Sequence, residues 1–249
     1  MTHPLLTDLP DWPEGDFSQF GPVEAKPLGR IQQMTARMLR RNWMAIPHVT
    51  HHDEVDVTEL EARRAAWNAA RPDAKATPLL PLVKAAVAAL QAFPVFNASL
   101  DGAGKLLTYK GYYHIGIAVD TLNGLLVPVI RDCDTKAPAA LAAEITAISA
   151  KARTKGLSMA EMSGGCFTIS SLGHLGGTGF TPIVNAPEVA ILGVSRSATR
   201  PVWNGTAFEP RLLLPLSLSY DHRVIDGADA ARFSKRLTEL LGDIRQLLL

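Results

Sequence analysis

The chain has 249 residues, of which 47% are hydrophobic, so it is long enough to bury one large core. Its 25 basic and 24 acidic side chains leave a formal net charge of +1, which argues against nucleic acid or an anionic membrane as the main partner. No apolar run reaches the roughly 18 residues that a membrane-spanning helix needs, and the two cysteines suit a reducing compartment. These features predict a cytoplasmic protein.

The first elements follow from proline content and hydrophobic spacing. Residues 1–22 hold four prolines among acidic and aromatic side chains, a composition typical of an extended arm. Apolar residues recur at helical spacing in residues 30–43, with arginines on the outer side. Residues 48–57 are strand-like. Residues 58–70 read as a helix that Thr58 and Glu61 would cap as a reciprocal box.

The rest of the chain alternates between helical and strand patterns, which predicts a single α/β domain with a mixed β-sheet flanked by helices. A second capping box, Ser158 with Glu161, precedes a strand that ends in a glycine-rich loop. The predicted elements are a buried helix at 79–93, strands at 112–120 and 125–132 joined through Asn123-Gly124, a helix at 138–155, a strand at 165–173, a hairpin of 188–203 and 206–220 across Asn204-Gly205, and a helix at 228–248.

The stretch LSLSYDHRVIDG, residues 216–227, runs from an alternating strand directly into a titratable cluster. His222 lies just after the end of that strand. Because an imidazole titrates near neutral pH, it suits the role of a general base. Asp226 comes just before a predicted helix, where an aspartate also serves as an ordinary N-cap. From the residues alone, a general base and a capped loop histidine are equally good interpretations.

The stretch FTISSLGHLGGTGF ends a predicted strand beside a flexible glycine-rich loop. A hydroxyl of Ser170 or Ser171 at that strand end is placed to donate a hydrogen bond to a developing oxyanion. The alternative is an ordinary serine-rich strand end, which the pattern by itself favours. The glycines fit neither a dinucleotide-binding loop nor a phosphate-binding loop, and no G-x-S-x-G nucleophile elbow is present.

A group of three histidines and an aspartate superficially resembles a set of metal ligands. The group consists of His48, His51, His52 and Asp53. On a strand His48 and His52 share one face while His51 points away, so the three do not converge on one ion. We therefore predict no metal site.

The segment SYDHRVIDG resembles the His-x-x-x-Asp-Gly signature of the 2-oxo acid dehydrogenase acyltransferases, a family similar in fold to chloramphenicol acetyltransferase. Three earlier segments resemble that family in the same order: PHVTHHDEVDVTELEARR, HIGIAVDTLNGLLVPVIRD and FTISSLGHLGGTGFTPIVNAPEVAILGV. The segments DFSQFGPVE and TPIVNAPEVAILGVS look most like the acetyl-transferring type of pyruvate dehydrogenase complexes. The resemblance implies an N-terminal arm at 1–22 and a chloramphenicol-acetyltransferase-like catalytic domain at 23–249.

The resemblance also implies a mechanism. His222 would take the proton from the thiol of coenzyme A, or from that of dihydrolipoamide in the reverse direction. The thiolate would attack the thioester carbonyl while the Ser170 hydroxyl stabilises the tetrahedral oxyanion. Ser170 is implied rather than Ser171, because the family's serine directly follows the pair that is here Thr168-Ile169.

Two further residues and the substrates take roles from the same resemblance. Asp226 would order its loop through an ion pair or backbone hydrogen bonds rather than move protons. Arg64 aligns with a family arginine near the nucleotide end of coenzyme A, where it would contact a phosphate. Coenzyme A is then a substrate, and the lipoyl group comes from a separate domain or chain.

The family resemblance implies a homotrimer in which each active site takes His222 from one chain and Ser170 from the next. The chain ends in the three leucines 247–249, and similar apolar tails in the family dock onto a neighbouring trimer to build a cubic core of twenty-four chains. The alternative is that these leucines finish the last helix against their own domain. The expected partners are a lipoyl-bearing protein and the decarboxylase and dihydrolipoamide dehydrogenase components.

The chain departs from the family's usual organisation, in which lipoyl domains and a small partner-binding domain precede the catalytic domain. The chain is then either a shortened piece of such a protein or a natural short form that receives lipoyl groups from another protein, and we expect the second. Two other functions stay open at this point: a same-fold enzyme that acylates a small alcohol or amine, and a stand-alone core scaffold that needs no activity.

Overall fold

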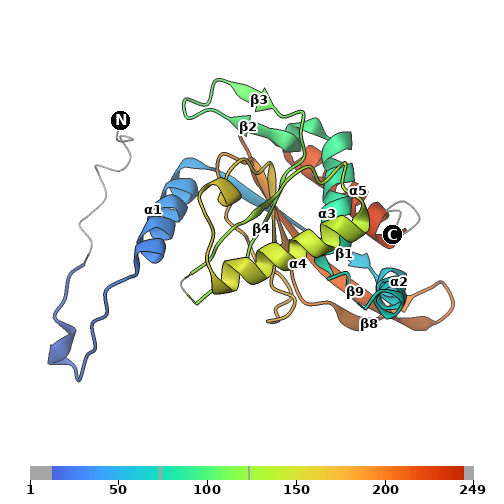
Figure 1. Ribbon diagram of the computed structural model, residues 1–249, viewed down its shortest axis with the longest axis horizontal. Coiled ribbons are helices and arrows are strands. Elements are labelled where there is room, and N and C mark those ends of the chain that lie inside the picture. The colour runs from blue at the N-terminus through green and yellow to red at the C-terminus, as the bar shows by residue number, and fades with distance from the viewer. Residues whose placement is uncertain (1–12, 73–74, 123, 244–249) are drawn as a thin grey trace.

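A computed structural model describes residues 13–72, 75–122 and 124–243, in which helices pack against one mixed β-sheet (Figure 1). The helices are α1 (Arg30–Ala45), α2 (Thr58–Ala70), α3 (Leu79–Ala92), α4 (Pro138–Thr154) and α5 (Gly227–Gly242), with short 3-10 turns η2 (Phe17–Gln19), η3 (Pro94–Asn97) and η4 (Ala160–Met162). The strands are β1 (His48–Asp56), β2 (Ala98–Leu100), β3 (Leu107–Tyr109), β4 (Ile115–Ile117), β5 (Val129–Ile130), β6 (Phe167–Ser171), β7 (Ala190–Val194), β8 (Ala198–Trp203) and β9 (Phe208–Asp221).

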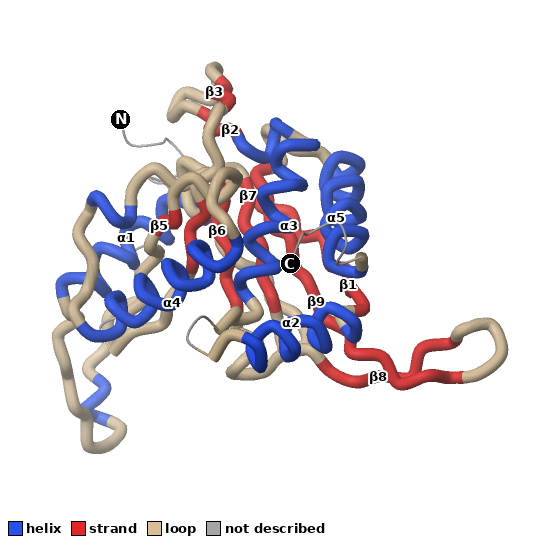
Figure 2. The backbone as a smooth tube through the Cα atoms, turned by 45° about the vertical axis from the view of Figure 1, so that its right-hand side comes forward, coloured by secondary structure: helices blue, strands red, loops and turns tan. Residues whose placement is uncertain are grey.

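The main sheet has the strand order β1-β9-β7-β6-β4-β5, and β8 pairs with the first part of β9. Strands β4, β6 and β7 are parallel to one another, whereas β9 is antiparallel to β1, β7 and β8. Strands β8 and β9 extend beyond the body of the domain as a hairpin (Figure 2). The predicted mixed sheet is therefore confirmed.

The sheet has one apolar face and one face of small and polar side chains. On β6, Phe167 and Ile169 join the main hydrophobic core, and strand alternation turns Thr168 and Ser170 to the opposite side. Side chains of α3, α4 and α5 complete the core, in which the ring of Phe233 lies 5.9 Å from that of Phe167. We call the opposite side, formed by Thr168, Ser170, Ser217 and Ser219, the polar face.

Hydrogen bonds across strands and one glycine shape the polar face. His52 Nδ1 on β1 lies 2.9 Å from Ser217 Oγ on β9. The segment between β6 and β7 also reaches this face, because a Cβ at Gly193 would lie 2.8 Å from the ring of Phe180. Any larger residue at position 193, beside Ser170 in the register of the sheet, would therefore have to displace the Phe180 ring.

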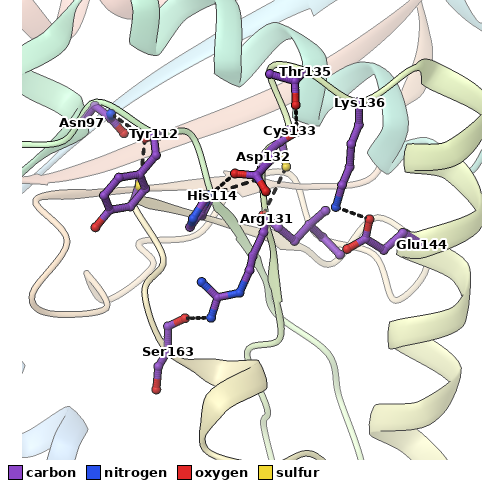
Figure 3. A network of polar contacts seen from close by, with 12 residues as sticks. Asn97, Tyr112, His114, Arg131, Asp132, Cys133, Thr135, Lys136, Glu144 and Ser163 are labelled. Atoms are coloured by element: carbon purple, nitrogen blue, oxygen red, sulfur yellow. Dashed lines mark hydrogen bonds and ion pairs between the residues drawn. The ribbon is translucent and has the colours of Figure 1, made fainter.

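The amino end of β6 is anchored by a sharp turn that follows β5. Asp132 has a φ of 49°, in the left-handed region that aspartate tolerates, and its backbone N–H donates to His114 Nδ1 at 3.0 Å (Figure 3). The Arg131 guanidinium donates to the carbonyl oxygen of Ser163 at 3.0 Å, just before β6. These contacts hold the start of β6 against β4 and β5.

Residues 13–29 and α1 project from the body of the domain (Figure 1). The predicted helix at 30–43 is confirmed as α1, but its apolar stripe is largely uncovered: Met38 is 45% exposed and Trp43 is 62% exposed. Contiguous apolar surface of this kind commonly marks contact with another chain.

The two predicted capping boxes have different outcomes. The box at the start of α2 is wrong, because Thr58 Oγ1 donates to Asp56 Oδ1 at 2.6 Å and Glu61 forms an ion pair with Arg64. The second box forms, since the Ser158 backbone N–H donates to Glu161 Oε2 at 2.9 Å and the Glu161 N–H reaches Ser158 Oγ at 3.4 Å. It opens only the short turn η4.

Several boundaries differ from the prediction. The strands predicted at 112–120 and 125–132 are much shorter, as β4 (Ile115–Ile117) and β5 (Val129–Ile130). The single strand predicted at 188–203 is interrupted at 195–197 and forms β7 and β8. The predicted turn at Asn204 joins β8 to the first part of β9, and β7 pairs with the last part of β9. The last helix ends at Gly242, and residues 247–249 lie outside the described residues, as does Asn123. The short hairpin of β2 and β3 was not predicted.

None of the helices in the described part of the chain combines the length and apolar character that a membrane crossing requires. Cys133 and Cys166 are buried free thiols. Burial raises the pKa of Cys133 to about 12 and also raises that of Cys166, so neither thiol forms a ready nucleophile.

Candidate functional site

His222 sits on an exposed turn directly after β9. Its backbone N–H donates to the carbonyl oxygen of Pro47 at 3.1 Å, which ties the turn to the start of β1. The preceding Asp221 is buried, and the Arg223 guanidinium holds its carboxylate with an Nε–Oδ1 distance of 2.9 Å and an Nη2–Oδ2 distance of 2.6 Å. This ion pair, which the sequence analysis did not select, fixes the turn that carries the imidazole.

Asp226 is the N-cap of α5. Its carboxylate accepts a hydrogen bond from the backbone N–H of Asp229 at 2.8 Å, and its backbone is extended, as at an ordinary N-cap. The pKa of the nearby Tyr220 hydroxyl is raised mainly by the burial of Tyr220 itself and further by the negative charge of Asp226. Asp226 is therefore the ordinary N-cap that the residue pattern offered, and the loop-ordering role implied by the resemblance stays a prediction.

Ser170 and Ser171 are the last two residues of β6, and strand alternation turns their side chains to opposite faces. Both residues line a cavity of about 490 Å³ near the carboxyl ends of the parallel strands β4, β6 and β7. In open α/β sheets this edge is the usual place for a ligand. Of the two hydroxyls, alternation places that of Ser170 on the polar face.

The same cavity contains polar groups that the sequence analysis missed. His174 lines it four residues after Ser170, in the glycine-rich loop, and Asp120 lines it from the end of β4. Thr77 Oγ1 and Ser195 Oγ are buried there without a hydrogen-bond partner among the described residues. Uncommitted hydroxyls of this kind suit a ligand that brings its own polar groups, because leaving them unpaired costs about 1–3 kcal/mol each.

A single chain does not bring His222 and Ser170 together. Ser170 pairs with Gly193, and Gly193 pairs with Ser217 on β9, five residues before His222. With a rise of about 3.3 Å per residue and about 4.8 Å between strands, the two side chains are on the order of 20 Å apart. They lie toward opposite ends of the sheet.

Arg64 is engaged within its own chain. Its Nε donates to Glu61 Oε1 at 2.9 Å, its Nη2 to Glu61 Oε2 at 2.6 Å and its Nη1 to the carbonyl oxygen of Ala76 at 3.0 Å. The guanidinium lines a small pocket beside Arg63 and Arg71, so the surroundings are basic. A phosphate contact by Arg64 stays a prediction.

The histidines of β1 serve the protein's own hydrogen bonds. His48 Nδ1 donates to the Ile46 carbonyl oxygen at 2.9 Å, and its Nε2 accepts from the Val184 N–H at 3.0 Å, while burial lowers its pKa. His52 instead faces Ser217, as described above. Across the ranges that the structure describes, no three His, Cys, Asp or Glu residues are grouped to hold a metal ion.

Comparison with known proteins gives a family and several close relatives. Residues 20–249 match the family described as 2-oxoacid dehydrogenases acyltransferase (catalytic domain). The chain is 60% identical over 243 residues to the dihydrolipoyllysine-residue acetyltransferase component of the pyruvate dehydrogenase complex of Pseudomonas aeruginosa. That match covers 97% of this chain and 44% of the relative, so the chain spans less than half of the relative's length.

Two solved structures are very similar. One is the dihydrolipoamide acetyltransferase of Azotobacter vinelandii, which was studied for the role of a serine, a histidine and an asparagine in its catalytic mechanism. Its TM-score is 0.93 and its sequence identity is 56%, over 97% of this chain and 100% of that one. The other is the cubic core of the pyruvate dehydrogenase multienzyme complex, with a TM-score of 0.92, an identity of 56% and the same coverage.

A more distant structure tests the predicted fold. Chloramphenicol acetyltransferase has a TM-score of 0.56 at 18% identity, over 82% of this chain and 94% of that one, a likeness that concerns the fold alone. The predicted fold is confirmed.

The spacing of the candidate residues has a counterpart in the Azotobacter protein. His222 lies 52 residues after Ser170, and Asp226 lies four residues after His222. The serine, histidine and asparagine of the Azotobacter study have the same two separations. The third position therefore carries an aspartate here and an asparagine there.

Proposed function

The chain belongs to the family of 2-oxoacid dehydrogenase acyltransferases, whose catalytic domain it matches over residues 20–249, and from that premise we propose that it transfers an acetyl group between a dihydrolipoyl thiol and coenzyme A. Relatives at 55–60% identity are named as acetyltransferase components of pyruvate dehydrogenase complexes, which supports the acetyl group in particular. We retain residues 1–22 as an arm and 23–249 as the catalytic domain.

The proposed reaction needs one base and one oxyanion donor. The His222 imidazole removes the proton from the thiol of coenzyme A, and the sulfur attacks the carbonyl carbon of the acetyl thioester. The Ser170 hydroxyl donates a hydrogen bond to the oxyanion of the tetrahedral intermediate. Collapse of the intermediate breaks the bond to the lipoyl sulfur, which takes the proton from the imidazolium, so protons and charges balance.

The observation that carries this assignment is the shared spacing of the candidate residues. A serine and a histidine separated by 52 residues occur in this chain and in a structural neighbour studied for the catalytic roles of those two residue types. The Ser170 hydroxyl is on the polar face and His222 is on an exposed turn, so each is open to another molecule. The imidazole is also the kind of base that suits a thiol whose pKa is about 8.5.

Asp226 lies at the position that corresponds to the asparagine of the Azotobacter study, and its substitution is a test of that position. Replacing Asp226 with asparagine should leave turnover and stability nearly unchanged, because asparagine caps the N–H of Asp229 as well as aspartate does. Replacing it with alanine should lower the free energy of unfolding by about 1 kcal/mol. Urea denaturation and steady-state turnover of the two variants measure this. A large loss of turnover in Asp226→Asn would give the negative charge a direct catalytic role.

We propose that the active site is assembled from two copies of the chain in a homotrimer. The separation on the order of 20 Å between His222 and Ser170 supports this, because a general base acts only within hydrogen-bond reach of the proton that it removes. The exposed apolar stripe of α1 supplies surface for contact with a neighbouring chain. The structural neighbour described as a cubic core supports further assembly of trimers into a core of twenty-four chains.

A mixing experiment tests the shared site. Co-expressing His222→Ala chains with Ser170→Ala chains, each with its own affinity tag, should yield mixed oligomers with about a quarter to a third of wild-type turnover. A trimer that holds both variants completes one site in three, and a larger core mixed at random completes about one in four. Each variant alone should be nearly inactive. Mixed oligomers that stay inactive would contradict a site shared between chains and leave the reaction itself to be tested by direct assay.

The reaction is tested by a direct assay with acetyl-coenzyme A and dihydrolipoamide. Turnover with both supports the proposal, whereas acetylation of small alcohols or amines without dihydrolipoamide would identify another acyltransferase. An assembled protein with no turnover would be a scaffold.

The proposed partners are a lipoyl-bearing protein, the decarboxylase and the dihydrolipoamide dehydrogenase, in a cytoplasmic setting that suits the two free thiols.

A further inference from the structure

A buried carboxyl group lies behind the strand that carries Ser170, outside the residues that the proposed mechanism uses. Glu188 is only 4% exposed and stands two residues before β7. Its Oε2 accepts a hydrogen bond from Thr168 Oγ1 on β6 at 2.6 Å. Asn185 Nδ2 lies 3.4 Å from the other carboxyl oxygen. A carboxylate at this depth is costly unless such donors compensate it, so the arrangement calls for an explanation.

The surrounding backbone is shaped to hold this pair. A Cβ at Gly165 would lie 2.7 Å from Glu188 Oε1, and a Cβ at Gly116 would lie 2.7 Å from Thr168 Oγ1. These distances are shorter than real Cβ contacts, so each glycine leaves room for one member of the pair. The absence of a side chain at these two glycines therefore makes room for the hydrogen-bonded Thr168 and Glu188 side chains.

The pair is connected to Ser170 through a single strand. Thr168 and Ser170 are alternate residues of β6, so their side chains share the polar face and lie about 6.6 Å apart along the strand. Thr168 pairs with Ile191 and Ser170 with Gly193 on β7, the strand that Glu188 leads into. The carboxylate thus links the residues just before β7 to Thr168 on β6, two residues before Ser170.

The charged and titratable groups around Glu188 are few. Burial raises the pKa of Glu188 to about 7, while the hydrogen bond from Thr168 and the charge of Lys110 lower it. Lys110 is itself half-buried and its pKa is lowered by burial. Cys166 is the third titratable group in electrostatic contact. The ionised form accepts from both Thr168 and Asn185, whereas the protonated form would have to donate its own proton, for example to Thr168 Oγ1, and so would reverse that hydrogen bond.

We propose that Glu188 is a positioning residue for acyl transfer: by accepting the hydrogen bond of Thr168, its carboxylate fixes the segment of β6 that presents the Ser170 hydroxyl to the oxyanion. This rests on the proposed role of Ser170. A small displacement of an oxyanion donor lowers the rate without changing substrate binding, because the hydrogen bond matters mainly in the transition state.

Glu188→Gln is the informative substitution because glutamine has the same shape but only one acceptor oxygen. Its amide NH2 would either oppose the Asn185 amide or donate to Thr168 Oγ1, so the hydrogen bond that Thr168 donates to a carboxylate is lost or reversed. We expect kcat to fall about tenfold in the assembled protein, with the KM values for coenzyme A and dihydrolipoamide nearly unchanged. Glu144→Gln, which removes a carboxylate on α4 that pairs with Lys136, is the matched control and should keep wild-type kcat.

A double-mutant cycle separates positioning from general stability. If Glu188 acts through Ser170, then Glu188→Gln should change kcat less than about twofold when Ser170 is already alanine. An equal tenfold loss in both backgrounds, or a change confined to KM, would overturn the proposal. An inactive wild-type protein, or a His222→Ala variant with full turnover, would instead contradict the proposed function.

Variants at Thr168 keep the test decisive if Glu188→Gln does not fold. Thr168→Val removes the hydroxyl at nearly constant volume and should reproduce the loss of kcat, whereas Thr168→Ser keeps the hydroxyl and should restore most of it. Light scattering first establishes that each variant assembles like the wild type. Equal kcat in the valine and serine variants would contradict the role of the hydrogen bond.

Discussion

Replacing His222 with alanine is expected to lower kcat by about 10²- to 10⁴-fold, the usual contribution of a positioned general base. The variant should fold normally, because the turn is held by the Asp221–Arg223 ion pair and by backbone hydrogen bonds rather than by the imidazole. Steady-state kinetics with acetyl-coenzyme A and dihydrolipoamide measure the loss, and circular dichroism checks the fold.

The pH dependence of the residual rate sharpens this test. Without the imidazole, reaction depends on thiolate already present in solution, so the residual rate should rise about tenfold per pH unit up to the thiol pKa of about 8.5. His51→Ala, on the opposite side of β1 from His52, is the control and should keep full turnover. The assignment is wrong if His174→Ala abolishes turnover while His222→Ala does not.

Replacing Ser170 with alanine is expected to lower kcat by about 10²- to 10³-fold, as in other sites that lose one oxyanion donor. The KM for coenzyme A should change little, because the hydrogen bond strengthens only as negative charge develops on the oxygen. The measurement is a pair of saturation curves for the wild type and the variant.

Ser171→Ala is the matched control, since it removes the same group one residue later on the other face of β6. It should keep kcat within a few-fold of the wild type. The reverse result, with the loss in Ser171→Ala alone, would move the oxyanion donor to the helix side of the cavity, which Ser171 also lines.

Local patterns in the sequence predicted most of the fold. The buried helix α3 follows from its nearly continuous apolar run, and the β8–β9 hairpin follows from the turn at Asn204. Strand alternation also predicted that His48 and His52 share a face, as their partners Val184 and Ser217 confirm. These features depend on residues close together in the chain.

Features that depend on distant partners were not predicted. The capping box at Thr58 failed because Asp56 and Arg64 compete for the same two side chains. Glu188 is the first residue of the strand predicted at 188–203, and only the fold reveals its burial against Thr168. The distance between His222 and Ser170 likewise depends on the order of β6, β7 and β9 in the sheet.

Because His222 and Ser170 lie toward opposite ends of one sheet, a folded monomer does not bring the proposed catalytic pair together. Protein concentration should then enter the rate law alongside substrate concentration. Dilution below the dissociation constant of the oligomer should lower specific activity steeply, although every chain stays folded. Newly synthesised chains would not turn over acetyl-coenzyme A until they met their neighbours, so assembly itself would act as the activation step.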